Sequence, residues 1–184
     1  DAYTISLDNE VTKHIRLLKE VKTNTGKDEN RKNNIDLLNE ALLNLKENKD
    51  KMLKEEYVVY RWKVLEQISD EYLYDDKSEK AIEYLDSIIS FLRKEQIKTS
   101  EFDYEFICAN TEYIIARIYS NLNDFSNSKL YYEKSYNHMK NNGEYLNNYS
   151  WFLVENGKEL ENALVMSYRS LEIHSDRDYF WDTY

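Results

Sequence analysis

The sequence predicts an all-α protein, an α-solenoid in which antiparallel helix pairs stack one after another. Three observations lead to this fold class: apolar residues recur at helical spacing, small residues recur at corresponding places, and turn-forming residues are rare. The 184 residues include 3 glycines and no proline, and these two residue types mark most turns and loops. With 41% hydrophobic residues, the chain has enough apolar side chains to bury a core. An irregular helical bundle is the alternative fold.

Residues 1–50 are expected to form an N-terminal helical hairpin, an atypical or capping repeat. One apolar stripe runs from Val11 to Val21 and a second from Ile35 to Leu45. Their spacing is that of helices over roughly 8–22 and 31–47. The polar stretch TNTGKDEN between the stripes predicts the turn that joins the two helices.

Residues 51–177 are expected to form three further helix pairs, over about 51–95, 99–142 and 143–177. In each pair a small residue of the first helix precedes a small residue of the second helix at a similar separation. These small residues are Ser69, Ala116 and Ser150 in the first helices, and Ala81, Ser128 and Ala163 in the second helices.

The small residues have a physical role in this interpretation. Two antiparallel helices approach within about 8–10 Å only where small side chains face each other. One helix pair alone cannot offset its loss of conformational entropy, about 1.5 kcal/mol per residue, so neighbouring pairs must stack. The spacing of 47 residues from Ser69 to Ala116 also predicts a turn near 97–100, with Thr99 or Ser100 as helix N-cap.

Three segments of the chain resemble the tetratricopeptide repeat (TPR) family. They are VLEQISDEYLYDDKSEKAIEYLDSII, YIIARIYSNLNDFSNSKLYYEKSY and YLNNYSWFLVENGKELENALVMSYRSLEI, which follow the family's bulky, small, Tyr and Ala pattern. The sequence departs from the pattern because proline is absent, Ile88 stands where a small residue is usual, and Glu112 replaces a bulky one. The resemblance implies helix pairs whose first helices line a concave, partner-binding face.

The end of the chain is unusually aromatic. Leu146 and Tyr149 lie four residues and one residue before the small residue Ser150. Trp181 and Tyr184 have the same spacing relative to position 185. We therefore expect residues 178–184 to be the truncated start of a further repeat helix, packed on the preceding second helix at Leu164, Tyr168 and Leu171. The alternative is that this half-repeat caps the stack.

The charge balance argues against several classes of partner. The 35 acidic and 25 basic residues give a net charge of −10, which repels phosphate backbones and anionic lipids. Because of this charge, the sequence predicts that the protein does not bind nucleic acid. It also lacks an apolar run long enough to span a bilayer, so no membrane insertion is predicted. The localisation is unknown: the cytoplasm is favoured, and export stays open because the chain begins at Asp1 rather than Met. Cys108, in the apolar stretch FICA, is expected to be buried and inert.

No constellation of residues points to catalysis. His14, His138 and His174 have no metal-ligand spacing, and each is expected to be solvated or to lie at a helix interface. The chain has no glycine-rich phosphate loop, nucleophile elbow or CxxC pair. The sequence therefore predicts no enzyme, no cofactor and no metal.

What remains is a surface for another protein, a partner peptide or helix that binds in the concave groove. The resemblance places one face of each first helix in that groove. The candidate groove residues are Lys63, Glu66, Asp70 and Tyr74 in the first pair, Asn110, Tyr113, Arg117 and Asn121 in the second, and Asn147 and Trp151 in the third, with Glu144 and Glu155 on the same face.

The chemistry of these side chains suits a peptide of mixed or mildly basic character. An Asn amide can bond a peptide backbone, Tyr and Trp can anchor it, and Arg117 can pair with an acidic group. Some members of the TPR family bind a partner's C-terminal carboxylate with basic and amide side chains. The resemblance places the acidic residues Glu66 and Asp70 at such positions, which disfavours this binding mode here. Three alternatives stay open: an interaction domain of a longer protein with activity elsewhere, a homo-oligomer, or a small-ligand carrier with an aromatic pocket near Trp151.

Overall fold

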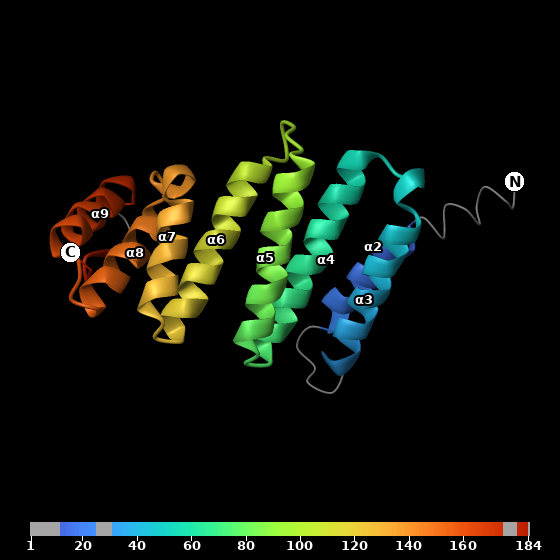
Figure 1. Cartoon of the computed structure of the whole chain (residues 1–184), viewed down its shortest axis with the longest axis horizontal. Helices are drawn as coiled ribbons and strands as arrows, with labels where there is room; N and C mark the ends of the chain where they lie inside the picture. Colours follow the sequence, from blue (N-terminus) through green and yellow to red (C-terminus); the bar gives the residue numbers. More distant parts are fainter. Residues whose placement is uncertain (1–11, 25–30, 175–179, 184) are drawn as a thin grey trace, which may run out of the picture. The chain divides into compact units, whose positions relative to one another are not determined.

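The computed structural model describes residues 12–24, 31–174 and 180–183. These residues form helices and no strand (Figure 1), which confirms the predicted all-α fold class. The α-helices are α2 (Lys13–Asn24), α3 (Arg31–Glu47), α4 (Lys54–Tyr74), α5 (Ser78–Glu95), α6 (Tyr104–Asn121), α7 (Phe125–Met139), α8 (Gly143–Glu155) and α9 (Leu160–Ile173), and a short 3-10 helix, η2, spans Lys49–Lys51.

The chain divides into two compact units, which are described separately. Unit 1 comprises residues 1–104 and holds α2 to α5; unit 2 comprises residues 105–184 and holds α6 from its second residue to α9. In unit 1, α2 packs on α3, α3 on α4 and α4 on α5; in unit 2, α7 packs on α8 and α8 on α9. We call α2, α4, α6 and α8 first helices and the others second helices.

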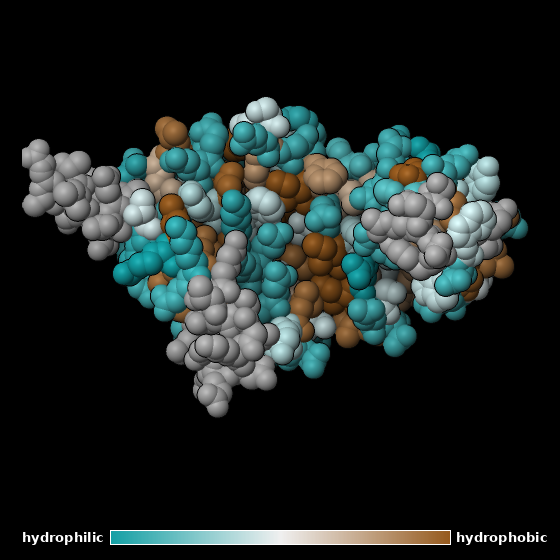
Figure 2. Space-filling model, turned by 180° about the vertical axis from the view of Figure 1, so that it is seen from behind, coloured by the Kyte–Doolittle hydropathy of each residue, from teal (hydrophilic) through white to brown (hydrophobic). Residues whose placement is uncertain are grey.

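The outer faces of the helices are largely polar. Figure 2 shows hydrophilic residues over much of one face of the molecule, with smaller hydrophobic areas between them. Charged residues make up 33% of the sequence, and most of those in the described helices are exposed, as expected for surface helices.

The small residues of the helix pairs are buried, as the sequence predicted. In one pair a contact confirms the close approach: the Ser128 Oγ atom donates a hydrogen bond of 2.9 Å to the Ala116 carbonyl oxygen. A serine hydroxyl reaches the backbone of a neighbouring helix only when the two axes lie close together. All six residues, Ser69, Ala81, Ala116, Ser128, Ser150 and Ala163, have at most 1% of their surface exposed.

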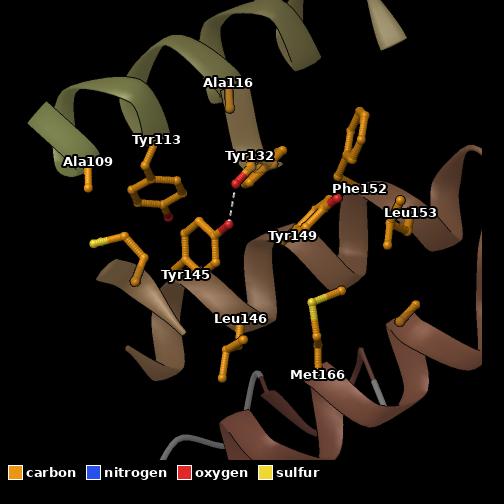
Figure 3. Packing of buried hydrophobic residues seen from close by; sticks show 12 residues of the cluster. Ala109, Tyr113, Ala116, Tyr132, Tyr145, Leu146, Tyr149, Phe152, Leu153 and Met166 are labelled. Carbon is orange, nitrogen blue, oxygen red and sulfur yellow. Dashed lines mark hydrogen bonds between the residues drawn. The ribbon is translucent and has the colours of Figure 1, made fainter. Parts of the chain in front are cut away.

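An aromatic cluster forms the core of unit 2 (Figure 3). The ring of Tyr132 stacks on that of Tyr149, with centroids 4.4 Å apart and planes inclined by 3°. The Tyr145 hydroxyl donates a 2.6 Å hydrogen bond to the Tyr132 carbonyl oxygen, so its buried polar group is satisfied. Phe125 and Phe152 stack at 5.0 Å beside them. These rings connect α7 to α8 where aliphatic side chains would leave gaps.

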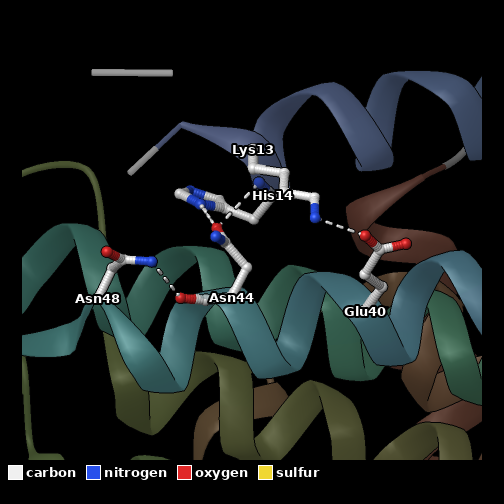
Figure 4. Close-up of polar contacts among 5 residues, drawn as sticks. All are labelled: Lys13, His14, Glu40, Asn44 and Asn48. Carbon is white, nitrogen blue, oxygen red and sulfur yellow. Dashed lines mark hydrogen bonds and ion pairs between the residues drawn. The ribbon is translucent and has the colours of Figure 1, made fainter. Parts of the chain in front are cut away.

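Polar contacts join the first two helices of unit 1 (Figure 4). The Asn44 Oδ1 atom accepts a hydrogen bond of 3.2 Å from the His14 backbone amide, and the His14 Nδ1 atom lies 3.2 Å from the same oxygen. Lys13 pairs with Glu40 at 2.6 Å, and the Asn48 Nδ2 atom donates to the Asn44 carbonyl oxygen at 3.0 Å. His14 is thus an interfacial histidine, buried between α2 and α3.

The turn between α5 and α6 differs from the sequence prediction. The Thr99 Oγ1 atom accepts hydrogen bonds from the Glu101 and Phe102 amides, at 3.3 and 3.1 Å. Thr99 therefore caps this turn and is not the N-cap of a helix, because α6 begins only at Tyr104. Lys98 and Asp103 close the turn with an ion pair of 2.8 Å.

The aromatic end of the chain lies partly outside the described residues. Tyr179 and Tyr184 belong to the part that is not described; Phe180 has 3-10 helical conformation and residues 181–183 form a turn. Phe180 is buried, and its ring centroid lies 6.0 Å from that of His174. On α9, Leu171 is buried, whereas Leu164 and Tyr168 remain about half exposed.

We expect Ala163→Leu to destabilise unit 2 by about 1–3 kcal/mol, because the larger side chain would overpack a fully buried position between α8 and α9. Urea denaturation followed by circular dichroism would measure the change. The matched control is Glu172→Leu at an exposed position of α9, where the change is expected to stay within about 0.5 kcal/mol. Equal stability of the two variants would contradict the packing described above.

We expect unit 2 to lose stability above about pH 10. Burial raises the pKa of Tyr132 far above its usual value, so the unfolded chain releases this proton at a lower pH than the folded chain. The stabilising contribution is therefore complete below pH 10 and declines as the pH rises beyond it, by up to about 1.4 kcal/mol per pH unit.

Tyr132→Phe tests this expectation through the slope of unfolding free energy against pH, measured with urea between pH 8 and 11. The variant should match the slope of the parent protein below pH 9 and fall less steeply above pH 10. Parallel curves over the whole range would show that Tyr132 does not ionise preferentially in the unfolded chain.

Candidate partner-binding site

A hollow of about 190 Å³ opens between the two first helices of unit 2. It collects three of the predicted groove residues, Arg117, Asn121 and Trp151. Arg117 and Asn121 are one turn apart on α6, and Trp151 lies one turn before Glu155 on α8, so each helix presents a pair of side chains on one face. The lining consists of Arg117, Ser120, Asn121, Tyr132, Asn148, Trp151, Phe152 and Glu155.

The Arg117 side chain is held beside Tyr113. Its guanidinium carbon lies 5.7 Å from the centre of the Tyr113 ring, within the range of a cation–π contact. The Asn148 Nδ2 atom donates a hydrogen bond to the Tyr113 hydroxyl, which ties α8 to α6. Burial raises the pKa of Tyr113, while the Asn148 hydrogen bond and the Arg117 charge act in the opposite direction. Arg117 itself is exposed. Its charge therefore lies at the hollow while its guanidinium contacts the Tyr113 ring.

The hollow offers one anchor and charges of both signs. Trp151 is 44% exposed, which is high for a residue of its size and leaves part of the indole open to a partner. Arg117 and Glu155, both exposed, supply a cation and an anion at the same hollow. This arrangement suits a segment that carries apolar, acidic and basic side chains together.

Unit 1 has a corresponding hollow between its two first helices, of about 330 Å³. It contains Lys63 and Glu66 of the predicted groove. Two buried polar atoms of α4, the Trp62 Nε1 donor and the Gln67 Oε1 acceptor, have no hydrogen-bond partner among the described residues. The hollow is lined by Ile15, Leu18, Lys19, Tyr60, Trp62, Lys63, Glu66 and Gln67.

Other predicted groove residues lie elsewhere. Asp70 and Tyr74 are exposed on α4, and Asn110 is half-buried on α6; none of the three lines either hollow. Tyr113 and Asn147 are a correction to the sequence prediction, because each is only 6% exposed. Tyr113 belongs to the aromatic core of unit 2, where its ring cannot anchor a partner.

Sequence reasoning also missed residues that line the hollows, namely Trp62, Gln67 and Asn148. Asn148 lies one residue after the predicted Asn147 on α8. The sequence spacing does indicate Asn148. Asn148, Trp151 and Glu155 are three and then four residues apart, which places them on one face of α8.

The His, Cys, Asp and Glu side chains of the described residues do not form a metal site. Within residues 12–24, 31–174 and 180–183, no group of three or more His, Cys, Asp and Glu side chains could hold a metal ion. Cys108 is buried, as predicted, and His138 is exposed. Among the helices that the structure describes, none is both long and apolar enough to cross a membrane.

Comparison with known proteins identifies the repeat type. A family model described as YpiA-like, C-terminal tetratricopeptide repeats matches residues 110–172. The crystal structure of BtubC (BKLC) from P. vanneervenii resembles the chain with a TM-score of 0.63 and 14% identity, over 93% of this chain and 74% of that one. Residues 110–172 thus match tetratricopeptide repeats, and the chain has a TPR-like fold.

Further structures have the same TPR-like fold. Those of the Podosopora anserina putative "kinesin light chain nearly identical TPR-like repeats" and of a single-substitution form of them match 91% of this chain, with 11% identity and TM-scores of 0.62 and 0.63. The matches cover 79% and 77% of those two chains, respectively. No curated protein sequence matches the chain. TPR-like repeats generally serve as non-enzymatic scaffolds for protein interactions, with extended surfaces formed by stacked helix pairs.

We expect Glu66→Gln to stabilise this TPR-like protein at pH 7. Partial burial, and after it the Asp70 carboxylate, raises the pKa of Glu66, although Lys63 acts in the opposite direction. Protonation thus favours the folded state: the contribution is complete below the unfolded pKa, about 4.3, and is lost as the pH rises through the higher folded pKa.

The measurement is the urea midpoint of the parent protein and the variant at pH 7 and pH 3. The midpoint of Glu66→Gln should be higher at pH 7 and equal at pH 3, while Glu83→Gln at an exposed position of α5 should change neither. A lower midpoint at pH 7 would mean that the ionised Glu66 carboxylate is stabilising.

Proposed function

We propose that this protein is a non-enzymatic scaffold that binds a peptide or helix of a partner protein on its first helices. The hollow between α6 and α8 is the main binding site, with Trp151 as the anchor and Arg117, Asn121 and Glu155 as polar contacts. The hollow between α2 and α4 is a second contact region. The same proposal treats residues 51–177 as three tetratricopeptide-like pairs and residues 1–50 as an atypical hairpin.

The observation that carries the proposal is the convergence of Arg117, Asn121 and Trp151 on one hollow. Each comes from the face of a first helix that the TPR resemblance assigns to partner binding. Exposed Trp and Arg side chains in one concavity are the types that dominate binding energy at protein interfaces. In unit 1, Lys63 and Glu66 line the corresponding hollow and add one charge of each sign.

The size of the unit 2 hollow favours a protein partner over a small-ligand carrier. Its volume of about 190 Å³ lies below the range of about 300–1,000 Å³ that is usual for small-molecule sites. A hollow of this size accepts individual side chains of a longer segment. The lining is also more polar than that of a typical small-molecule pocket, since it includes Arg117, Asn121 and Glu155.

Site-specific photo-cross-linking in a native lysate would test the proposal. A benzophenone amino acid at Glu155 should capture a partner, whereas the same group at the exposed Glu172 of α9 should not. The cross-linked segment, identified by mass spectrometry and synthesised as a peptide, would then be titrated by calorimetry into the parent protein and into variants.

We expect Trp151→Ala to weaken binding of that peptide at least tenfold, since loss of a central aromatic anchor commonly costs about 2 kcal/mol or more. Arg117→Ala should also weaken it, and more strongly at low salt. Leu164→Ala, at a half-exposed position of α9, is the matched control and should bind as the parent does. Equal affinity for Trp151→Ala and the control would place the partner elsewhere.

A further inference from the structure

A second hollow in unit 2 lies outside the proposed groove. It has a volume of about 330 Å³ and is formed by the second helices α7 and α9 together with α8. Figure 3 shows three of its residues, Tyr149 and Leu153 on α8 and Met166 on α9. The hollow between α6 and α8 shares no lining residue with this second hollow, so the two hollows are separate sites.

The floor of this second hollow is apolar. Tyr149, Leu153 and Met166 are buried, with 6%, 0% and 8% of their surface exposed. Two further residues form apolar walls that reach solvent: Val165, which is 67% exposed, and Tyr136, which is 36% exposed. A ligand that fills the hollow would therefore cover aliphatic, aromatic and sulfur-containing surface.

The rim of the hollow carries an excess of negative charge. Glu133 of α7 and Glu159, the residue before α9, both line it. Lys129 is the cation beside them: its Nζ atom pairs with the Glu159 carboxylate and lies 3.5 Å from Glu133 Oε1. The burial of Tyr149, and after it the charges of both glutamates, raise the pKa of its phenol.

The two glutamates differ in how fully they are engaged. Asn162 donates a 3.1 Å hydrogen bond to Glu159 Oε2, and Lys129 occupies the other oxygen. Glu159 has a positive φ of 47°, a conformation that such contacts must hold because it is costly for a residue with a Cβ atom. Glu133 makes the longer of the two contacts with Lys129. Its carboxylate is exposed and can accept a new donor.

We propose that this hollow binds an arginine side chain of a partner protein. The aliphatic stem would lie on Leu153, Val165 and Met166, and the guanidinium would pair with the Glu133 carboxylate beside the Tyr136 ring. Arginine fits better than lysine because its planar cation pairs with a carboxylate through two parallel hydrogen bonds and also stacks on aromatic faces. An acidic side chain is excluded by the charge of Glu133 and Glu159, and a neutral one would leave the excess negative charge of the rim uncompensated.

The pocket chemistry can be tested without knowing the partner. The probe is n-butylguanidinium, which reproduces the arginine stem and head, and its neutral counterpart is n-butylurea. Titrations followed by NMR would record methyl shifts of Val165, Leu153 and Met166. We expect saturable shifts with n-butylguanidinium and at least fivefold weaker binding of n-butylurea.

Three variants assign the binding to this hollow. Glu133→Gln, which keeps the shape of an exposed side chain, should weaken n-butylguanidinium binding at least fivefold, and Val165→Ser should weaken it by removing apolar wall. Glu172→Gln, an exposed carboxylate on α9, and Arg117→Ala in the groove should leave it unchanged. Equal binding of the two probes, or binding that is insensitive to Glu133→Gln, would overturn the proposal.

The peptide acetyl-Ala-Leu-Arg-Leu-Ala-amide distinguishes a protein partner from a free small cation. It should bind more tightly than n-butylguanidinium, shift the same methyl groups and lose this binding when its arginine is replaced by glutamine. If n-butylguanidinium binds and the peptide does not, the hollow accepts a small cation and the assignment to a protein side chain is wrong. This result would leave the groove proposal intact, because that proposal depends on Trp151 and Arg117.

Discussion

The close approach of paired helices at small residues is the constraint on which the other features depend. Ser128 reaches the Ala116 carbonyl oxygen across the α6–α7 pair, and Ala81 and Ala163 are fully buried in the other pairs. Larger side chains beside these points form the core of unit 2 and the walls of the hollow between the two first helices of each unit.

In unit 2 the same packing produces two sites around one aromatic pair. Tyr132 lines the hollow between α6 and α8, Tyr149 lines the hollow between α7 and α9, and their rings stack at 4.4 Å. A closely packed core does not deform continuously, so this pair gives both hollows a rigid wall. The Tyr145 hydrogen bond to the Tyr132 backbone fixes the neighbouring ring.

The charges of the two hollows differ in a way that suits different contacts. The groove between α6 and α8 presents Arg117 and Glu155 beside Trp151, whereas the hollow on the second helices presents Glu133 and Glu159 over an apolar floor. The exposed guanidinium of Arg117 makes a cation–π contact with the ring face of Tyr113.

The sequence by itself determined the fold class, the small residues at the helix contacts and the burial of Cys108, because these follow from the helical period and from side-chain size. The helical period also placed Arg117, Asn121 and Trp151 on the helix faces from which they line one hollow. Only the tertiary structure decided that Tyr113 and Asn147 are covered and that Asn148 lines the groove. The helical period gives the direction of a side chain on its own helix, but the packing of neighbouring helices determines which directions reach solvent. Glu133 and Glu159 are another example. They lie on different elements, and only the packing of α7, α8 and α9 brings both to the rim of one hollow.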